Sequence, residues 1–155
     1  MIPEQTMVET FDVFVVGCEG RLRAALTATL GAEVGPDAAA EALAYGWLHW
    51  DRVRSMDNPV GYLYKVGRDK GRKQLQRRQP FIPSVPEHRA PWVEPGLSPA
   101  LTSLAERQRT VVLLLHGYQW SLTEVAEALS ISKSSVQTHH DRGMKKLRRS
   151  LGAHR

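Results

Sequence analysis

The chain has 155 residues, of which 42% are apolar and 24% are charged, and its net charge is +5. This length allows one ordinary domain or two small ones, and the apolar fraction argues against wholesale disorder. No apolar run approaches the ~20 residues of a membrane span, and the first residues lack the pattern of a signal peptide. The single cysteine, Cys18, excludes an intramolecular disulfide and a cysteine-based zinc site. These features predict a soluble, cytoplasmic protein with no membrane partner.

The first half of the chain has the pattern of packed helices. Apolar residues recur at spacings of three and four over residues 11–29, and a second, alanine-rich helix is expected over 36–50. Asn58 followed by Pro59 predicts the start of a third helix, with Asn58 as its cap. Cys18 lies on the apolar stripe of the first helix, which favours a small core residue over a reactive thiol.

Six of the nine prolines fall between Pro80 and Pro99, a density that neither a helix nor a central strand tolerates. We therefore expect an extended linker over residues 80–98. It separates a helical domain at 8–79 from a second domain at 99–151, and each is expected to bury its own small core. No segment alternates with a period of two, so the predicted fold class is all-α.

The second domain contains the strongest local signal. Ser121 and Glu124 form a capping box before a short apolar-faced helix, and a tight turn at Ser130 leads to a longer helix that begins near Ser132. Many such turns place glycine where Ser130 stands, because the backbone there is left-handed, and serine adopts this conformation at modest cost. This order of elements predicts a helix-turn-helix, whose second helix enters the major groove of DNA.

Basic residues support a nucleic-acid partner. Residues 64–79 carry seven Lys or Arg against one Asp, and residues 133–155 repeat that balance. Side chains that suit base edges and phosphates lie off the packing stripe of the second helix. The candidate DNA contacts among these side chains include Lys133, Ser134, Gln137, Thr138, Asp141, Arg142 and Lys145. The alternative is that both basic segments are ordinary solvated helix faces.

Aromatic residues stand close to the first basic segment. Four of them precede or overlap it: Trp47, Trp50, Tyr62 and Tyr64. Aromatic rings beside basic side chains suit single-stranded bases and their phosphates. The alternative is that aromatics at helical spacing belong to the core, which we expect for Trp47 and one of the two tyrosines. Glycine-rich phosphate loops, nucleophile elbows and metal-binding helices are absent from the sequence, so we expect no catalytic residue, metal or cofactor.

Two stretches carry a resemblance to a known family. The C-terminal pattern resembles region 4 of sigma-70 family initiation factors; its residues are Leu104, Arg109, Val111, Val112, Leu114, Glu124, Val125, Ala126, Leu129, Ser135, Val136, Gln137, Thr138, Leu147 and Arg148. An earlier pattern resembles the end of region 2; its residues are Trp50, Asn58, Pro59, Tyr62, Leu63, Tyr64, Lys65, Val66, Asp69, Arg77 and Arg78. Two such domains with a proline-rich linker are similar to the extracytoplasmic-function (ECF) group.

The resemblance implies a promoter-specificity subunit of core RNA polymerase that directs transcription initiation, with an anti-sigma factor as a possible partner. The helix at 36–50 would dock on the polymerase clamp, with Asp37 and Glu41 as contacts. The next helix would read the single strand of the minus-ten promoter element, with candidate contacts Asp57, Asn58, Tyr62, Tyr64, Lys65, Arg68, Asp69 and Arg72. The helix-turn-helix would read the duplex minus-35 element, with Gln137, Thr138, Asp141 and Arg142 as readers and with His139 added to the candidate contacts.

Some residues depart from the family pattern. The clamp-binding stretch usually reads Glu-Asp-x-x-Gln-Glu, whereas here Pro36 and Ala40 replace two of the polar residues, and Asp69 stands where Asn is general. A stand-alone helix-turn-helix regulator that has lost polymerase engagement therefore stays open as a second hypothesis. A non-specific basic binder of RNA or DNA is a third, and it would show steep salt dependence without sequence preference.

Overall fold

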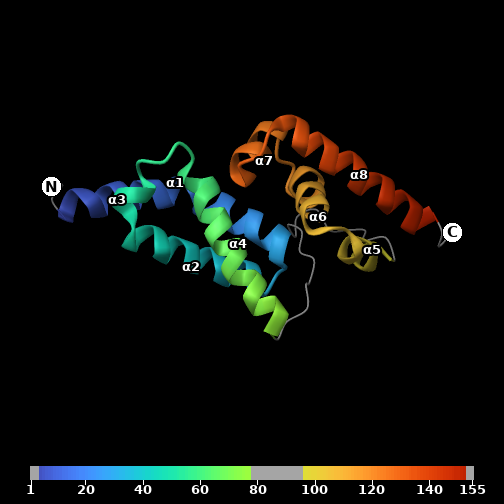
Figure 1. Cartoon of the computed structure of the whole chain (residues 1–155), viewed down its shortest axis with the longest axis horizontal. Helices are drawn as coiled ribbons and strands as arrows, with labels where there is room; N and C mark the ends of the chain where they lie inside the picture. The colour runs from blue at the N-terminus through green and yellow to red at the C-terminus, as the bar shows by residue number, and fades with distance from the viewer. Residues whose placement is uncertain (1–3, 78–95, 153–155) are drawn as a thin grey trace.

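The computed structural model describes residues 4–77 and 96–152, with side chains from residue 10 onward in the first range. Every regular element in these ranges is helical, which confirms the predicted all-α class (Figure 1). The predicted linker at 80–98 lies outside the described residues except for 96–98, so the domain boundaries stay predictions. No helix of the described part is long and apolar enough to cross a membrane.

The first half forms a helical unit in which α1 runs out, α2 returns beside it, and α4 crosses both (Figure 1). Its elements are α1 (Glu4–Leu30), α2 (Val34–Leu48), α3 (Trp50–Val53) and α4 (Pro59–Arg77). The turn between α1 and α2 uses Gly31 with a φ of 95°, a left-handed conformation that glycine adopts without steric cost. Relative to the sequence prediction, α2 begins two residues earlier and stops before Trp50, which starts α3.

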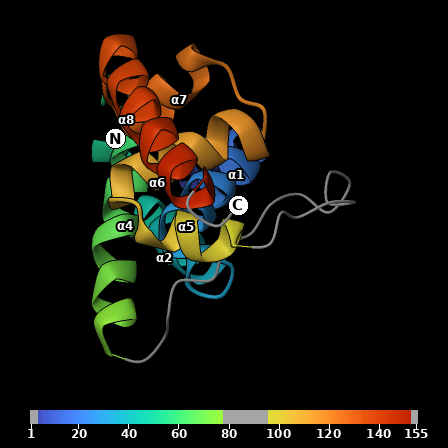
Figure 2. The same cartoon turned by 90° about the vertical axis from the view of Figure 1, so that its right-hand side faces the viewer.

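The second half contains the predicted helix-turn-helix. Its elements are α5 (Leu97–Ser103), α6 (Glu106–Val112), the π-helical turn η2 (Leu113–Gly117), α7 (Leu122–Leu129) and α8 (Lys133–Gly152). α8 lies across α6 and α7 and extends to the C-terminal end of the described chain (Figure 2). The π-helical turn was not predicted, because its apolar residues have no spacing that separates it from an α-helix.

The two halves pack against each other, and their buried residues form one cluster instead of the two separate cores expected from the sequence. The seam between them contains a buried polar group. The Thr29 hydroxyl of α1 hydrogen-bonds with the Tyr64 hydroxyl of α4 at 2.7 Å and accepts from the Thr110 hydroxyl of α6 at 3.0 Å. Arg109 donates from Nη2 to the Thr29 carbonyl at 3.0 Å. Buried polar groups need such partners, so these bonds fix how α1, α4 and α6 meet.

Cys18 is buried on α1, as its place on the apolar stripe predicted. Burial, with a smaller contribution from the neighbouring Glu19 carboxylate, raises the pKa of its thiol to about 11. The thiolate is the reactive form of cysteine, so this side chain stays protonated and behaves as a small apolar residue.

Candidate nucleic-acid interface

The helix-turn-helix turn is held by local hydrogen bonds. Ser121 Oγ accepts from the Glu124 amide at 3.1 Å, and the Glu124 carboxylate accepts from the Ser121 amide at 3.3 Å, which confirms the capping box. α7 ends at Ser130 with φ 55° and ψ 45°, the left-handed conformation predicted for this serine. Ser132 Oγ then accepts from the Ser135 amide at 3.0 Å and opens α8. These caps set the direction in which α8 leaves the turn.

One side of α8 is fixed by packing against α6 and α7. Val136 and Leu147 are buried, and α8 approaches α6 closely at Gly143, where an added Cβ would lie 2.9 Å from Val112 Cγ2. Because this side is occupied, the opposite side of α8 faces solvent along its length.

Seven of the eight predicted readers lie on that solvent side. They recur in two rows spaced by four residues and are exposed: Lys133, Ser134, Gln137, Thr138, Asp141, Arg142 and Lys145. Residues four apart share one face of a helix, so α8 offers a single continuous polar surface. His139 is the exception, since it is only partly exposed. Burial and then the nearby Arg107 and Arg142 charges lower its pKa.

Two of these readers are tied to each other and to a histidine. Gln137 Nε2 donates to Asp141 Oδ1 at 2.8 Å, and the same oxygen lies 3.0 Å from His140 Nδ1. The hydrogen bond with His140, followed by that with Gln137, lowers the pKa of Asp141. The ionised carboxylate orients the Gln137 amide, and this bond must be exchanged before the amide pairs with a base edge.

A histidine pair joins α8 to the π-helical turn. His116 Nε2 and His140 Nε2 lie 2.8 Å apart, which is hydrogen-bonding distance. Burial, with a smaller contribution from His140, lowers the pKa of His116. This pair could not be predicted from the sequence, because the two residues are 24 positions apart on different elements. The described residues hold no group of three or more His, Cys, Asp or Glu placed to bind a metal.

The start of α4 matches its prediction. Asn58 Oδ1 accepts from the Gly61 amide at 3.0 Å, which confirms Asn58 as the cap and Pro59 as the first helical residue. The predicted single-strand contacts differ in accessibility: Asp57, Lys65, Asp69 and Arg72 are exposed, whereas Asn58, Tyr62 and Arg68 are partly buried. Four of these side chains are therefore open to solvent, and the other three are partly covered by neighbouring elements.

Tyr64 does not lie on an open surface. Its side chain is 2% exposed, and burial raises the pKa of its hydroxyl. It is the tyrosine that belongs to the core, so in this arrangement it is not available to stack on a base. Trp50 is also core, at 3% exposed, whereas Trp47 is 40% exposed and rests against the Phe11 ring, so its assignment to the core was only partly right.

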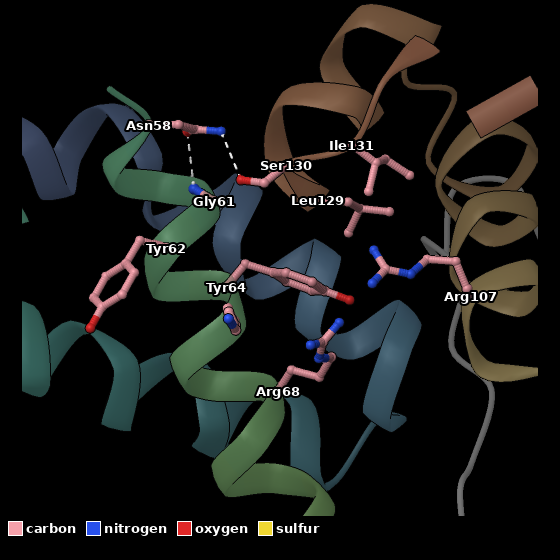
Figure 3. A pocket seen from close by; sticks show the side chains of 10 residues that line it. Asn58, Gly61, Tyr62, Tyr64, Arg68, Arg107, Leu129, Ser130 and Ile131 are labelled. Carbon is pink, nitrogen blue, oxygen red and sulfur yellow. Dashed lines mark hydrogen bonds between the residues drawn. The ribbon is translucent and has the colours of Figure 1, made fainter. Parts of the chain in front are cut away.

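Tyr62 is only partly buried and packs at the edge of the core. Figure 3 shows its ring on the opposite side of α4 from Tyr64. Its hydroxyl accepts from Arg52 Nη2 at 3.1 Å and lies 3.2 Å from the Tyr45 hydroxyl. Tyr62 therefore keeps an accessible ring edge beside a guanidinium group, the combination that suits a base next to its phosphate.

The turn of the helix-turn-helix lies on the start of α4. Asn58 Nδ2 donates to the Glu127 carbonyl at 2.5 Å and to Ser130 Oγ at 3.2 Å. A Cβ at Gly61 would collide with Ser130 Oγ and Asn58 Nδ2, so a larger residue here would displace both side chains of this contact. The contact covers part of the surface that the sequence assigned to single-strand reading.

An ion pair also joins the two halves of the chain, further along α4. Arg72 of α4 donates to Glu106 of α6 from Nε at 2.9 Å and from Nη2 at 2.5 Å. This fork raises the pKa of Arg72, with the hydrogen bond as its main cause. The contacts of Glu106, Arg107 and Thr29 were not predicted from the sequence. Contacts between residues over 30 positions apart leave no periodic pattern.

The predicted clamp-docking helix has an open face. Asp37 and Glu41 are exposed on α2, and the exposed row continues to Leu48, which is 76% exposed. Acidic side chains followed by an uncovered leucine and the half-exposed Trp47 form a mixed polar and apolar surface. Contiguous apolar exposure of this kind is typical of a site that a protein partner covers.

Comparison with known proteins finds a family model and a solved structure that resemble this chain. The family model described as sigma-70, region 4, matches residues 100–149. Among solved structures, the sigma factor RpoE from Bartonella quintana, in complex with the anti-sigma factor NepR, is similar over 95% of this chain and 99% of that chain. The TM-score is 0.61 at 20% sequence identity, which shows a shared fold. No curated protein matches the chain. The comparisons thus show a likeness to sigma-70 region 4 over residues 100–149 and a shared fold over most of the chain.

Proposed function

We propose that the chain is an ECF-type sigma factor that binds core RNA polymerase and directs promoter recognition and transcription initiation. The observation that carries this proposal is the exposed polar face of α8 on a fully capped helix-turn-helix within the region 4 match. Such a helix fits the major groove, where Gln and Arg pair with base edges. Lys133, Ser134, Gln137, Thr138, His139, Asp141, Arg142 and Lys145 are its proposed minus-35 contacts.

The first half supplies the other two activities of this proposal. Residues 8–79 act as a region 2-like domain, in which α2 docks on the polymerase clamp through Asp37 and Glu41. The start of α4 reads the minus-ten strand, with proposed contacts Asp57, Asn58, Tyr62, Lys65, Arg68, Asp69 and Arg72, while the buried Tyr64 supports the helix from the core. Residues 80–98 link this domain to the region 4 domain at 99–151. An anti-sigma protein is a further partner, and the cytoplasm is the proposed site of action.

Promoter opening in this proposal needs no catalytic residue. Strand separation follows when a protein binds the open strand more tightly than the duplex, because the difference in binding free energy shifts the equilibrium. The charge of α4 and the ring of Tyr62 favour a single strand, since stacking requires an unpaired base. The protein is accordingly a regulatory DNA-binding subunit and not an enzyme.

The test is reconstitution with purified core polymerase. The chain should co-elute with core in gel filtration, and the complex should open a promoter bubble that permanganate detects on unpaired thymines. Substituting Asp37 and Glu41 together by lysine should reduce co-elution, whereas Glu33→Lys, an exposed acid just before α2, is the control. Absence of any complex with core would exclude the sigma-factor proposal.

A stand-alone helix-turn-helix regulator is the second candidate. Two observations favour it: Pro36 and Ala40 replace polar residues of the usual clamp motif, and the helix-turn-helix turn covers the start of α4. It predicts duplex binding without polymerase, whereas the first candidate predicts promoter binding only with it. A gel shift with and without core distinguishes the two.

A further inference from the structure

A cavity of about 370 Å³ lies between the two halves of the chain. α4 lines one side, and α6 with the end of α7 lines the other (Figure 3). Its size is at the lower end of the range of about 300–1,000 Å³ for small-molecule pockets. The cavity therefore has room for a small ligand that would touch both halves at once.

The charged residues of the cavity wall are all basic. Lys65 and Arg68 come from α4 and Arg107 comes from α6, and none of the lining residues is acidic. Figure 3 shows the guanidinium groups of Arg68 and Arg107 on either side of the Tyr64 hydroxyl. Three like charges around one partly open cavity repel one another, and the repulsion is strongest for the less exposed Arg68 and Arg107.

Two of the guanidinium nitrogens lack hydrogen-bond acceptors. Nε of Arg68 and Nη1 of Arg107 are buried and make no hydrogen bond within the described residues. The Asp69 carboxylate lies 3.8 Å from Arg68 Nε, which is too long for a hydrogen bond, and Glu106 is already held by Arg72. An unsatisfied buried donor is costly, and the cost is larger for a charged group. The wall is therefore short of negative charge and of acceptor oxygens.

We propose that this cavity binds the phosphate group of a small molecule. A phosphate supplies several acceptor oxygens and a negative charge, and the planar fork of arginine matches its geometry. Because Arg68 and Arg107 belong to different halves, the bound phosphate bridges them and stabilises the packing of α4 against α6 and α7. Free inorganic phosphate and a mononucleotide share this chemistry. Lys65 and Arg68 are also proposed minus-ten contacts, whereas Arg107 is not, so the phosphate site shares part of its wall with the proposed strand-reading surface.

The test uses the full chain and two probes, inorganic phosphate and adenosine 5′-monophosphate, titrated at constant ionic strength. Calorimetry should show saturable binding with one site, and the melting temperature should rise with probe concentration. Arg107→Gln should weaken binding at least tenfold. Arg149→Gln removes the same charge from an exposed position on α8 and should bind as the wild type does. Tighter binding of the nucleotide than of inorganic phosphate identifies a nucleotide site, and equal binding identifies free phosphate.

Equal responses of Arg107→Gln and Arg149→Gln, or a response that never saturates, would overturn the proposal. Arg107→Lys covers the case in which Arg107→Gln does not fold, because it keeps the charge and removes only the planar fork. It should fold and still bind more weakly than the wild type. Promoter opening with core polymerase is measured separately on the same preparations, so loss of phosphate binding leaves the sigma-factor proposal intact.

Discussion

The side chain of Asn58 makes hydrogen bonds in both halves of the chain, and one of them reaches the backbone of Glu127 in the second half. Its oxygen caps α4 at the Gly61 amide, while its nitrogen donates to the Glu127 carbonyl at 2.5 Å. One residue therefore both begins the proposed strand-reading helix and holds the helix-turn-helix against it. Asn58 can contact a DNA strand through its amide nitrogen only if the hydrogen bond to Glu127 breaks.

Substitution of Asn58 should separate these two roles. Asn58→Asp keeps the cap acceptor but loses the donor, so α4 should stay folded while the halves separate more readily. Asn58→Ala loses both, and loss of a cap costs about 1 kcal/mol. Denaturant unfolding measures stability, and small-angle scattering measures compactness. Equal compactness of the Asp variant and the wild type would show that the Glu127 bond does not hold the halves together.

The Arg72–Glu106 pair should contribute modestly to the same packing. Both side chains are partly exposed, at 46% and 25%, so solvent screening limits the pair to about 0.2–1 kcal/mol. Arg72→Glu and Glu106→Arg should each expand the chain, and the double exchange should restore compactness. A double-mutant cycle on unfolding free energies gives the coupling. Additive effects of the two single changes would mean that the pair is not coupled.

The turn of the helix-turn-helix offers a test of backbone strain. Ser130 has a φ of 55°, and a left-handed conformation costs a non-glycine residue about 1–2 kcal/mol. Ser130→Ala keeps this cost and loses the bond from Asn58, whereas Ser130→Gly removes the cost and loses the same bond. The glycine variant should therefore be more stable than the alanine variant by about 1 kcal/mol in urea unfolding. The reverse order would contradict the assigned backbone conformation.

Much of this local structure could be predicted from the sequence. The capping box, the cap at Asn58 and the left-handed Ser130 depend on residues within three or four positions of one another, so their signals are local. The packing of the halves could not be predicted, because Asn58 and Glu127 are 69 positions apart and neither segment's periodicity records the other. For the same reason Tyr62 and Tyr64 could not be told apart until the Thr29 contact was known.

The histidines near α8 should make stability depend on pH. Burial lowers the pKa of both His116 and His139 below the ordinary value of 6.5, so their neutral forms stabilise the folded chain. This stability is fully present above about pH 6.5 and is lost as the pH falls through the lower folded-state pKa. His116→Gln should reduce the loss of melting temperature between pH 7 and pH 5. His49→Gln, at the distant α2–α3 junction, is the control, and equal slopes for the two variants would exclude His116.

Arg142 should carry sequence information if α8 reads DNA as proposed. A bidentate contact to guanine is worth about 1–3 kcal/mol, so Arg142→Ala should weaken binding to the minus-35 element and relax the base preference at one position. Arg149→Ala removes an exposed charge from the same helix outside the proposed contacts. Binding of every single-base variant of the element with holoenzyme measures both effects. An unchanged preference with Arg142→Ala would show that this side chain is not a reader.

The polar seam around Thr29 has a consequence for how the chain separates. The seam between α1, α4 and α6 is made of hydroxyl groups and the Arg109 guanidinium, as well as apolar side chains. Water can replace each of these hydrogen bonds once the helices part, whereas exposing a leucine to water brings no compensating interaction. Burial already lowers the pKa of Arg109, so rehydration of its charge favours opening. Hydration of these polar groups would therefore offset part of the free-energy cost of separating the two halves.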